Sequence, residues 1–83
     1  MIRGAPQIQP IPIAEAVRLC KALTDRQVEV LALKCHGFTN KEICRHLDIE
    51  IKTVERHFNH IFTAIGARNA PAATAIAAKG GLV

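Results

Sequence analysis

The sequence has 83 residues, of which 49% are hydrophobic, and it carries a formal net charge of +4. This length excludes a second hydrophobic core, and the hydrophobic fraction excludes a disordered chain. Alanine is the most frequent hydrophobic residue and only three phenylalanines represent the aromatic ones, a composition that favours closely packed helices over sheets. The mild positive charge permits a nucleic-acid partner.

The longest uncharged stretches, residues 4–14 and 69–78, are too short for a membrane helix, which needs about 20 residues. The start of the chain contains three prolines and lacks the apolar core of a signal peptide. We therefore expect a cytoplasmic protein that has no membrane partner and needs no cofactor.

Residues 1–12 are expected to form an extended linker, because Pro6, Pro10 and Pro12 lack backbone donors and disfavour helix before them. A short helix is predicted over residues 13–22, where apolar side chains recur at helical spacing opposite charged ones. Its apolar residues are Ile13, Ala16, Val17 and Cys20. These first 22 residues are interpreted as a linker and short helix before a domain that spans residues 23–83.

A capping box marks the start of the next helix, where Thr24 is followed three residues later by Gln27. Gly37 is expected to end this helix in a left-handed conformation. The predicted apolar stripe consists of Val28, Leu31, Ala32 and Cys35.

A second capping box, formed by Thr39 and Glu42, opens a helix of about two turns. Its inward residues are expected to be Ile43 and Leu47. The following residues 48–50 show no helical periodicity and predict a tight turn between two helices.

The next helix is predicted over residues 51–65 and is amphipathic, with Gly66 as its cap. Its apolar face contains Val54, Phe58, Ile61 and Ile65. Its polar face contains Lys52, Glu55, Arg56 and Asn59.

A last, alanine-rich helix is expected after Asn69, a capping residue, with Pro71 early in the helix where a missing N–H costs nothing. The glycines at positions 80 and 81 should end it after Lys79. Because the sequence shows no strand pattern, the predicted fold class is all-α.

A short capped helix, a three-residue turn and a longer amphipathic helix match the helix-turn-helix arrangement. In that arrangement the first helix holds the second at a fixed angle, so that the second fits a major groove about 12 Å wide. An ordinary helical hairpin gives the same pattern, since connections of three residues are common. The pattern alone leaves both interpretations open.

The segment LTDRQVEVL at residues 23–31 resembles the opening of the LuxR-type (GerE-like) DNA-binding domain, L-T-x-R-E-x-E-V-L. Residues 37–43, GFTNKEI, are similar to the family's G-x-S-N-K-E-I. The rest of the family motif reads K-T-V-x-x-H-x-x-x-I-x-x-x-L-G-x-x-N. The residues of this sequence that match it are Lys52-Thr53-Val54, His57, Ile61, Ile65-Gly66 and Arg68-Asn69. The resemblance runs from about Leu23 to Val83. It implies a four-helix domain, here with an additional short N-terminal helix, that regulates transcription by binding DNA through the third of its helices and dimerises through the fourth.

Five residues are implied to contact phosphate. Thr39, Asn40 and Lys41 lie at a helix start, where anions bind in any case. Lys52 and Thr53 are expected to hold the DNA backbone and fix register without reading sequence.

Three further residues are implied to reach base edges. Val54 is a candidate for contact with a thymine methyl group, and packing in the core is an equal alternative. Arg56 is a candidate for phosphate or guanine, and Asn59 for adenine. A solvated surface is the alternative for both polar residues, whereas His57 is expected to be a packed, structural histidine.

The alanine-rich last helix is interpreted as a homodimer contact, because small side chains let two helices approach closely. Packing within its own domain is the alternative. The expected interface residues are Ala72, Ala73, Ile76 and Lys79.

The sequence departs from the family pattern at four positions. Glu55 replaces a Lys or Arg, and Ala64 replaces a Lys. Asp48 replaces the glycine of the turn, and Asp tolerates a positive φ better than most residues. Glu50 replaces the serine that usually caps the next helix.

Positive and negative side chains balance, four against four, between residues 38 and 60. Because non-specific DNA affinity arises mainly from counterion release, we expect weak binding by a monomer and a shallow salt dependence. Double-stranded DNA and a second copy are therefore the expected partners, with RNA polymerase and an upstream signal-receiving domain as further candidates. A protein-interaction module with weakened DNA binding is the alternative function.

Three histidines on the helix-turn-helix segment, His46, His57 and His60, suggest that DNA affinity rises on mild acidification. Their alternative is a neutral packing or surface role. No nucleophile with a matching base, no phosphate-binding glycine loop and no paired carboxylates are found, so an enzyme is not expected.

The three cysteines lie in helical patterns beside apolar residues, so Cys20, Cys35 and Cys44 are expected to be reduced, buried thiols. A zinc site built from Cys35, His36, Cys44 and His46 is a weak alternative. Residues 44 and 46 are two apart and point to different sides of a helix, and the spacing matches no standard finger. No metal is therefore expected.

Overall fold

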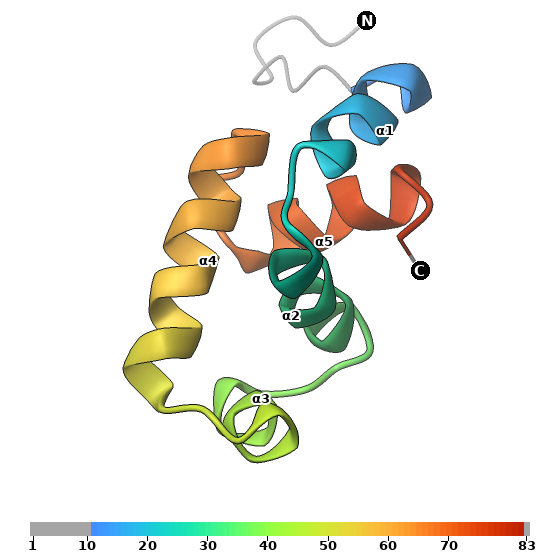
Figure 1. The fold of residues 1–83 in the computed structure, drawn as a ribbon. Coiled ribbons are helices and arrows are strands. Elements are labelled where there is room, and N and C mark those ends of the chain that lie inside the picture. Colours follow the sequence, from blue (N-terminus) through green and yellow to red (C-terminus); the bar gives the residue numbers. More distant parts are fainter. Residues whose placement is uncertain (1–10, 83) are drawn as a thin grey trace, which may run out of the picture.

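A computed structural model describes residues 11–82 and shows five helices (Figure 1). The helices are α1 (Ile13–Lys21), α2 (Asp25–Cys35), α3 (Asn40–Leu47), α4 (Ile51–Ile65) and α5 (Ala70–Lys79). No strand occurs between residues 11 and 82, which confirms the predicted all-α fold class. Most of the expected linker, including Pro6 and Pro10, lies outside the described residues.

Side chains cap the starts of three helices as the sequence predicts. The Thr24 hydroxyl accepts a hydrogen bond from the Gln27 N–H at 3.1 Å, and the Gln27 side chain accepts one from the Thr24 N–H at 2.9 Å. Thr39 and Glu42 form the same reciprocal pair at 3.2 and 2.8 Å. At α5 the Asn69 side chain accepts from the N–H of residue 72 at 2.9 Å. Each bond satisfies an amide that would otherwise lack a partner in the first turn.

A residue with positive φ follows each of the helices α2 to α5, and these residues are Gly37, Asp48, Gly66 and Gly81. Gly37 has φ +93° after α2, and its N–H and that of Phe38 bond to the carbonyls of Lys34 and Leu33. This pair of hydrogen bonds is the Schellman motif, which accompanies the left-handed cap predicted at Gly37. Asp48 ends α3 with φ 56° and ψ 50°, a left-handed conformation that Asp adopts more readily than most residues.

The core forms where α2 packs against α3, α4 and α5 (Figure 1). The predicted stripe of α2 is wrong in part, because the fully buried residues are Val30 and Leu31 while most of the stripe is half-buried. A helix with neighbours on several sides buries a wider arc than the single face that periodicity assumes. The core residues are Ala16, Cys20, Leu23, Val30, Leu31, Ile43, Val54, Phe58, Ile61, Ile65, Ala73, Ile76 and Ala77.

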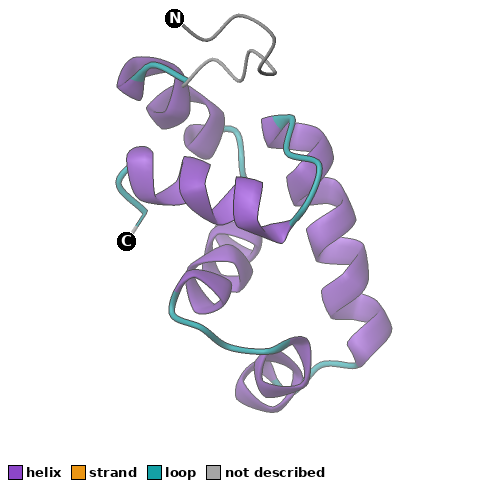
Figure 2. Ribbon diagram, turned by 180° about the vertical axis from the view of Figure 1, so that it is seen from behind, coloured by secondary structure: helices purple, strands orange, loops and turns teal. Residues whose placement is uncertain are grey.

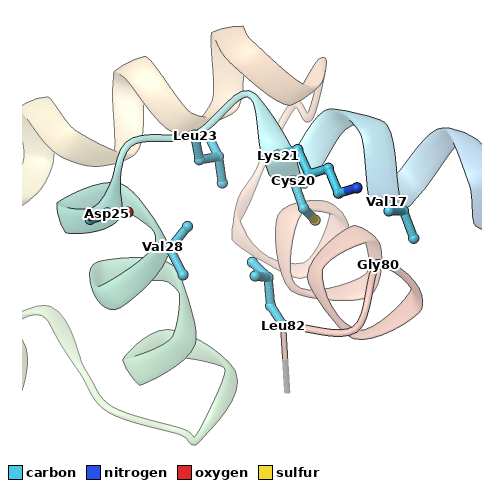
Figure 3. A pocket seen from close by; sticks show the side chains of 8 residues that line it. All are labelled: Val17, Cys20, Lys21, Leu23, Asp25, Val28, Gly80 and Leu82. Carbon is cyan, nitrogen blue, oxygen red and sulfur yellow. The ribbon is translucent and has the colours of Figure 1, made fainter.

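The additional helix α1 packs closely on α5, and its Ala16 and Cys20 are buried. A Cβ atom on Gly80 would lie 2.6 Å from the Cys20 sulfur and 2.9 Å from the Ala16 carbonyl oxygen, so only glycine fits there. The Lys79 ammonium donates to the Ile11 carbonyl oxygen at 2.8 Å. Figure 3 shows Cys20, Val28 and Leu82 around a hollow between α1, α2 and the end of α5.

All three cysteines are free, as expected, but only Cys20 is buried, whereas Cys35 and Cys44 are half-buried. Burial raises the pKa of the Cys20 and Cys35 thiols. Within residues 11–82, no helix has the length and apolar character that crossing a bilayer requires.

Candidate nucleic-acid interface

The segment from α3 to α4 has helix-turn-helix geometry. The chain reverses within three residues, from the left-handed Asp48 to the extended Glu50, after which α4 begins. Ile43 of α3 and Val54 of α4 are both fully buried where these two helices pack together. This packing fixes the angle of α4 relative to the rest of the domain.

Helix α4 lies along the outer edge of the molecule in both views (Figures 1 and 2). Its buried residues, Val54, Phe58, Ile61 and Ile65, share one face. The opposite side carries exposed polar residues whose spacing of i, i+3, i+4 and i+7 places them together. These residues are Lys52, Glu55, Arg56 and Asn59, and they are called the outer face of α4 below.

The charged groups of the outer face are not paired with one another. In the part of the chain that the structure describes, ion pairs join only Arg18 to Glu15, at 2.7 Å, and Arg26 to Glu29, at 3.0 Å. Lys52 therefore keeps its charge available for an anionic partner, as does Arg56. A polar face with exposed, unpaired cations is what contact with phosphate requires.

At the start of α3, Thr39 and Lys41 are exposed and Asn40 is half-buried. The Thr39 oxygen accepts the N–H of Glu42, which leaves its hydroxyl proton available to a further acceptor. The reciprocal bond from the Thr39 N–H lowers the pKa of Glu42. The Asn40 side-chain oxygen is buried and has no hydrogen-bond partner among the described residues.

The prediction for Val54 needs correction. Its side chain is 0% exposed, so the core-packing alternative applies and no surface remains for a thymine methyl group. Its position on the buried face of α4, which it shares with Phe58 and Ile61, explains this. Thr53, the preceding residue, is half-buried.

His57 is half-buried beside α2 rather than part of the outer face. Burial lowers its pKa below 6.5, and nearby Arg26, His60 and Arg56 lower it further. A lowered pKa opposes protonation of His57 on mild acidification and favours the neutral alternative for this residue. His46 and His60 are exposed, and the rings of His46 and Phe38 form a T-shaped pair whose centroids are 5.6 Å apart.

The structure also corrects two of the residues expected at a dimer interface. Ala73 is 0% and Ile76 is 8% exposed, because α5 lies between α1 and α2 and uses these residues for packing within the domain. Ala72 is half-buried and Lys79 is exposed, so these two remain at the surface.

Sequence reasoning missed two exposed residues of α4, Ile51 and Thr63, and considered His60 only for its protonation. Thr63 follows Asn59 by four residues and His60 follows Arg56 by four, so helical spacing extends the outer face to both. Ile51, the first residue of α4, is 40% exposed. No sequence signal indicates this, since an apolar residue at a helix start is normally assigned to the core.

The structure brings together no set of metal ligands within residues 11–82, where no three His, Cys, Asp or Glu side chains gather in positions that could hold an ion. The zinc alternative for residues 35–46 thus finds no support in the described part of the chain.

Comparison with known proteins agrees with this geometry. The family described as bacterial regulatory proteins, luxR family, matches residues 21–77, from the end of α1 through most of α5. Oxygen regulatory protein NreC of Staphylococcus aureus, in strains JH9, JH1 and Mu3, is 43% identical over 51 residues, or 61% of this chain. The matched segment covers 24% of each NreC chain, so the chain corresponds to about a quarter of these relatives. No solved structure gives a significant match. Because the family match covers well over half of the chain, this protein belongs to the luxR (GerE) family, and α2–α5 form its helix-turn-helix DNA-binding domain, with α1 as an additional N-terminal helix.

Proposed function

We propose that this domain binds double-stranded DNA sequence-specifically by inserting the outer face of α4 into the major groove, and that it regulates transcription in this way. The observation that supports this most directly is the position of α4, whose polar side is covered by no other described helix (Figures 1 and 2). An α-helix with exposed polar side chains fits the width of the groove.

The side chains divide into two roles on this proposal. Arg56 and Asn59 reach base edges, where a guanidinium matches guanine and a carboxamide matches adenine. The other exposed or half-buried polar residues bind phosphate and fix the register of the helix. These phosphate-binding residues are Thr39, Asn40, Lys41, Lys52 and Thr53.

Two copies of the domain are proposed to bind together through the surface of α5 that remains outside the core. Pro71, Ala75 and Ala78 are exposed there, next to Ala72 and Lys79. A two-fold dimer would present two α4 helices to half-sites about 34 Å apart, one helical turn of DNA. Dimerisation also compensates for the balanced charge of residues 38–60, since two weak contacts act together. RNA polymerase and an upstream signal-receiving domain are further proposed partners.

The test is fluorescence anisotropy on DNA selected from a random pool, measured over a range of salt concentrations. Lys52→Ala should weaken binding to all sequences and reduce the salt slope by about one, because one phosphate contact is lost. Lys21→Ala is the matched control, since Lys21 is an exposed lysine on α1, away from α4. Equal effects of both substitutions would contradict the proposal. A folded domain that binds no DNA from any pool would instead favour the protein-interaction alternative.

A further inference from the structure

Glu55 is the acidic residue of the outer face of α4. It lies three residues after Lys52 and four before Asn59, so helical spacing places its side chain beside those that the proposed function assigns to DNA. It belongs to the first half of the 15-residue helix, near the turn. A negative charge in this position opposes the attraction between the helix and phosphate, and therefore needs an explanation.

The carboxylate has no role within the described part of the molecule. Glu55 is exposed, and no side-chain hydrogen bond or ion pair between described residues involves its carboxylate. Lys52 and Arg56, the nearest cations along α4, are not paired with it either. Its oxygens are therefore free to accept hydrogen bonds from a partner.

The hydrogen-bond donors and acceptors in the major groove indicate which base can serve as that partner. An ionised carboxylate only accepts hydrogen bonds, so guanine, with its N7 and O6 acceptors, and thymine, with its O4 acceptor, repel it. Adenine has an N6 donor, but it lies next to the N7 acceptor. Cytosine presents its N4 donor, from which a carboxylate oxygen accepts a hydrogen bond. We propose that Glu55 reads a cytosine in the DNA site and determines which base pair the domain accepts at that position.

The same charge has a second effect, which is to reduce binding to other sequences. At a non-cognate site the carboxylate loses hydration without gaining a donor, and its repulsion from phosphate is uncompensated. Glu55 thus lowers the total DNA affinity and increases the difference in affinity between cognate and non-cognate sites. This inference rests on the proposed function, because it needs α4 in the major groove.

The experiment is selection of bound DNA from a random pool, carried out in parallel with the wild-type domain, Glu55→Gln and Glu50→Gln. Glu50 is the matched control, since it is an exposed glutamate whose side chain makes no cap hydrogen bond in the turn. Wild type and Glu50→Gln should both select cytosine at one position of each half-site, with about tenfold weaker binding when that base pair is changed. Glu55→Gln should lose this preference and turn to adenine, which a carboxamide matches, while the other positions stay the same.

Two results would overturn the inference and are distinguishable. If Glu55→Gln and Glu50→Gln raise the affinity for all sequences equally and leave every base preference unchanged, Glu55 acts only through its charge, and the proposed function survives. If the folded wild-type domain selects no sequence, the proposed function fails together with the inference. Circular dichroism of each variant verifies folding, and both glutamates are exposed, so neither substitution should disturb the core.

Discussion

Two residues of the helix-turn-helix segment have unusual backbone or protonation behaviour, namely Asp48 in the turn and His57 within α4. Asp48 adopts φ 56°, where most side chains are strained, and so replaces the glycine that the family uses at this turn. His57 is half-buried and does not belong to the outer face of α4. Its lowered pKa links protonation to stability.

Because the folded state lowers the pKa of His57 below the unperturbed 6.5, protons bind the unfolded chain preferentially. The stability contribution of neutral His57 is complete above pH 6.5 and is lost as pH falls through 6.5 toward the lower folded value. Urea unfolding between pH 8 and 5 should therefore show a steeper acid-side decline for wild type than for His57→Gln. Arg26→Ala should also reduce the decline, since Arg26 contributes to the lowered pKa after burial. Parallel profiles for all three proteins would contradict this assignment.

At the scale of elements, most helix boundaries could be predicted, because local signals set them. Helix α4 spans residues 51–65 as expected, with Gly66 after it, and the caps at Thr24, Thr39 and Asn69 form the expected hydrogen bonds. For Ala73 and Ile76 the sequence left two alternatives open, a dimer contact and packing within the domain. Their observed burial results from the packing of α1 and α2 on α5, and the sequence does not show which distant segments pack on this helix.

The crossing of α1 and α5 depends on the absence of a side chain at Gly80. Gly80→Ala should lower the free energy of unfolding by about 1–3 kcal/mol, because the new methyl group meets Cys20 and a backbone oxygen in a packed site. Adding Cys20→Ala should restore part of this loss by removing the sulfur. Ala75→Ser, an added atom on the exposed side of the same helix, is the control and should change stability by less than about 0.5 kcal/mol. A neutral effect of Gly80→Ala in urea unfolding would mean that the helices do not approach so closely.

At the scale of the whole molecule, the folded unit extends beyond the segment that the family shares. The family match begins at residue 21, yet α1 contributes Ala16 and Cys20 to the same core as α2, α4 and α5. The sequence predicts a helix over residues 13–22 but does not predict that this helix packs on α5. The apolar face of a helix alone does not identify the surface that it covers.

A chain that begins at residue 23 should therefore be less stable than the full chain by about 2–4 kcal/mol, because removing α1 uncovers apolar surface on α5. Thermal and urea unfolding of both proteins measure the difference. The double variant Arg18→Ala, Lys21→Ala changes only exposed residues of α1 and should unfold close to wild type. An unchanged urea midpoint for the shortened chain would show that α1 adds nothing to the core.

The packing of α1 on α5 also determines where the described ends of the chain lie. Ile13 begins α1 and Leu82 follows α5, and both ribbon views place the start of α1 and the end of α5 away from α3 and its turn into α4 (Figures 1 and 2). On the proposed function, a fluorophore or a surface tether attached beside either residue would project away from a duplex bound by α4. Either position is therefore suitable for single-molecule measurements of residence time on DNA.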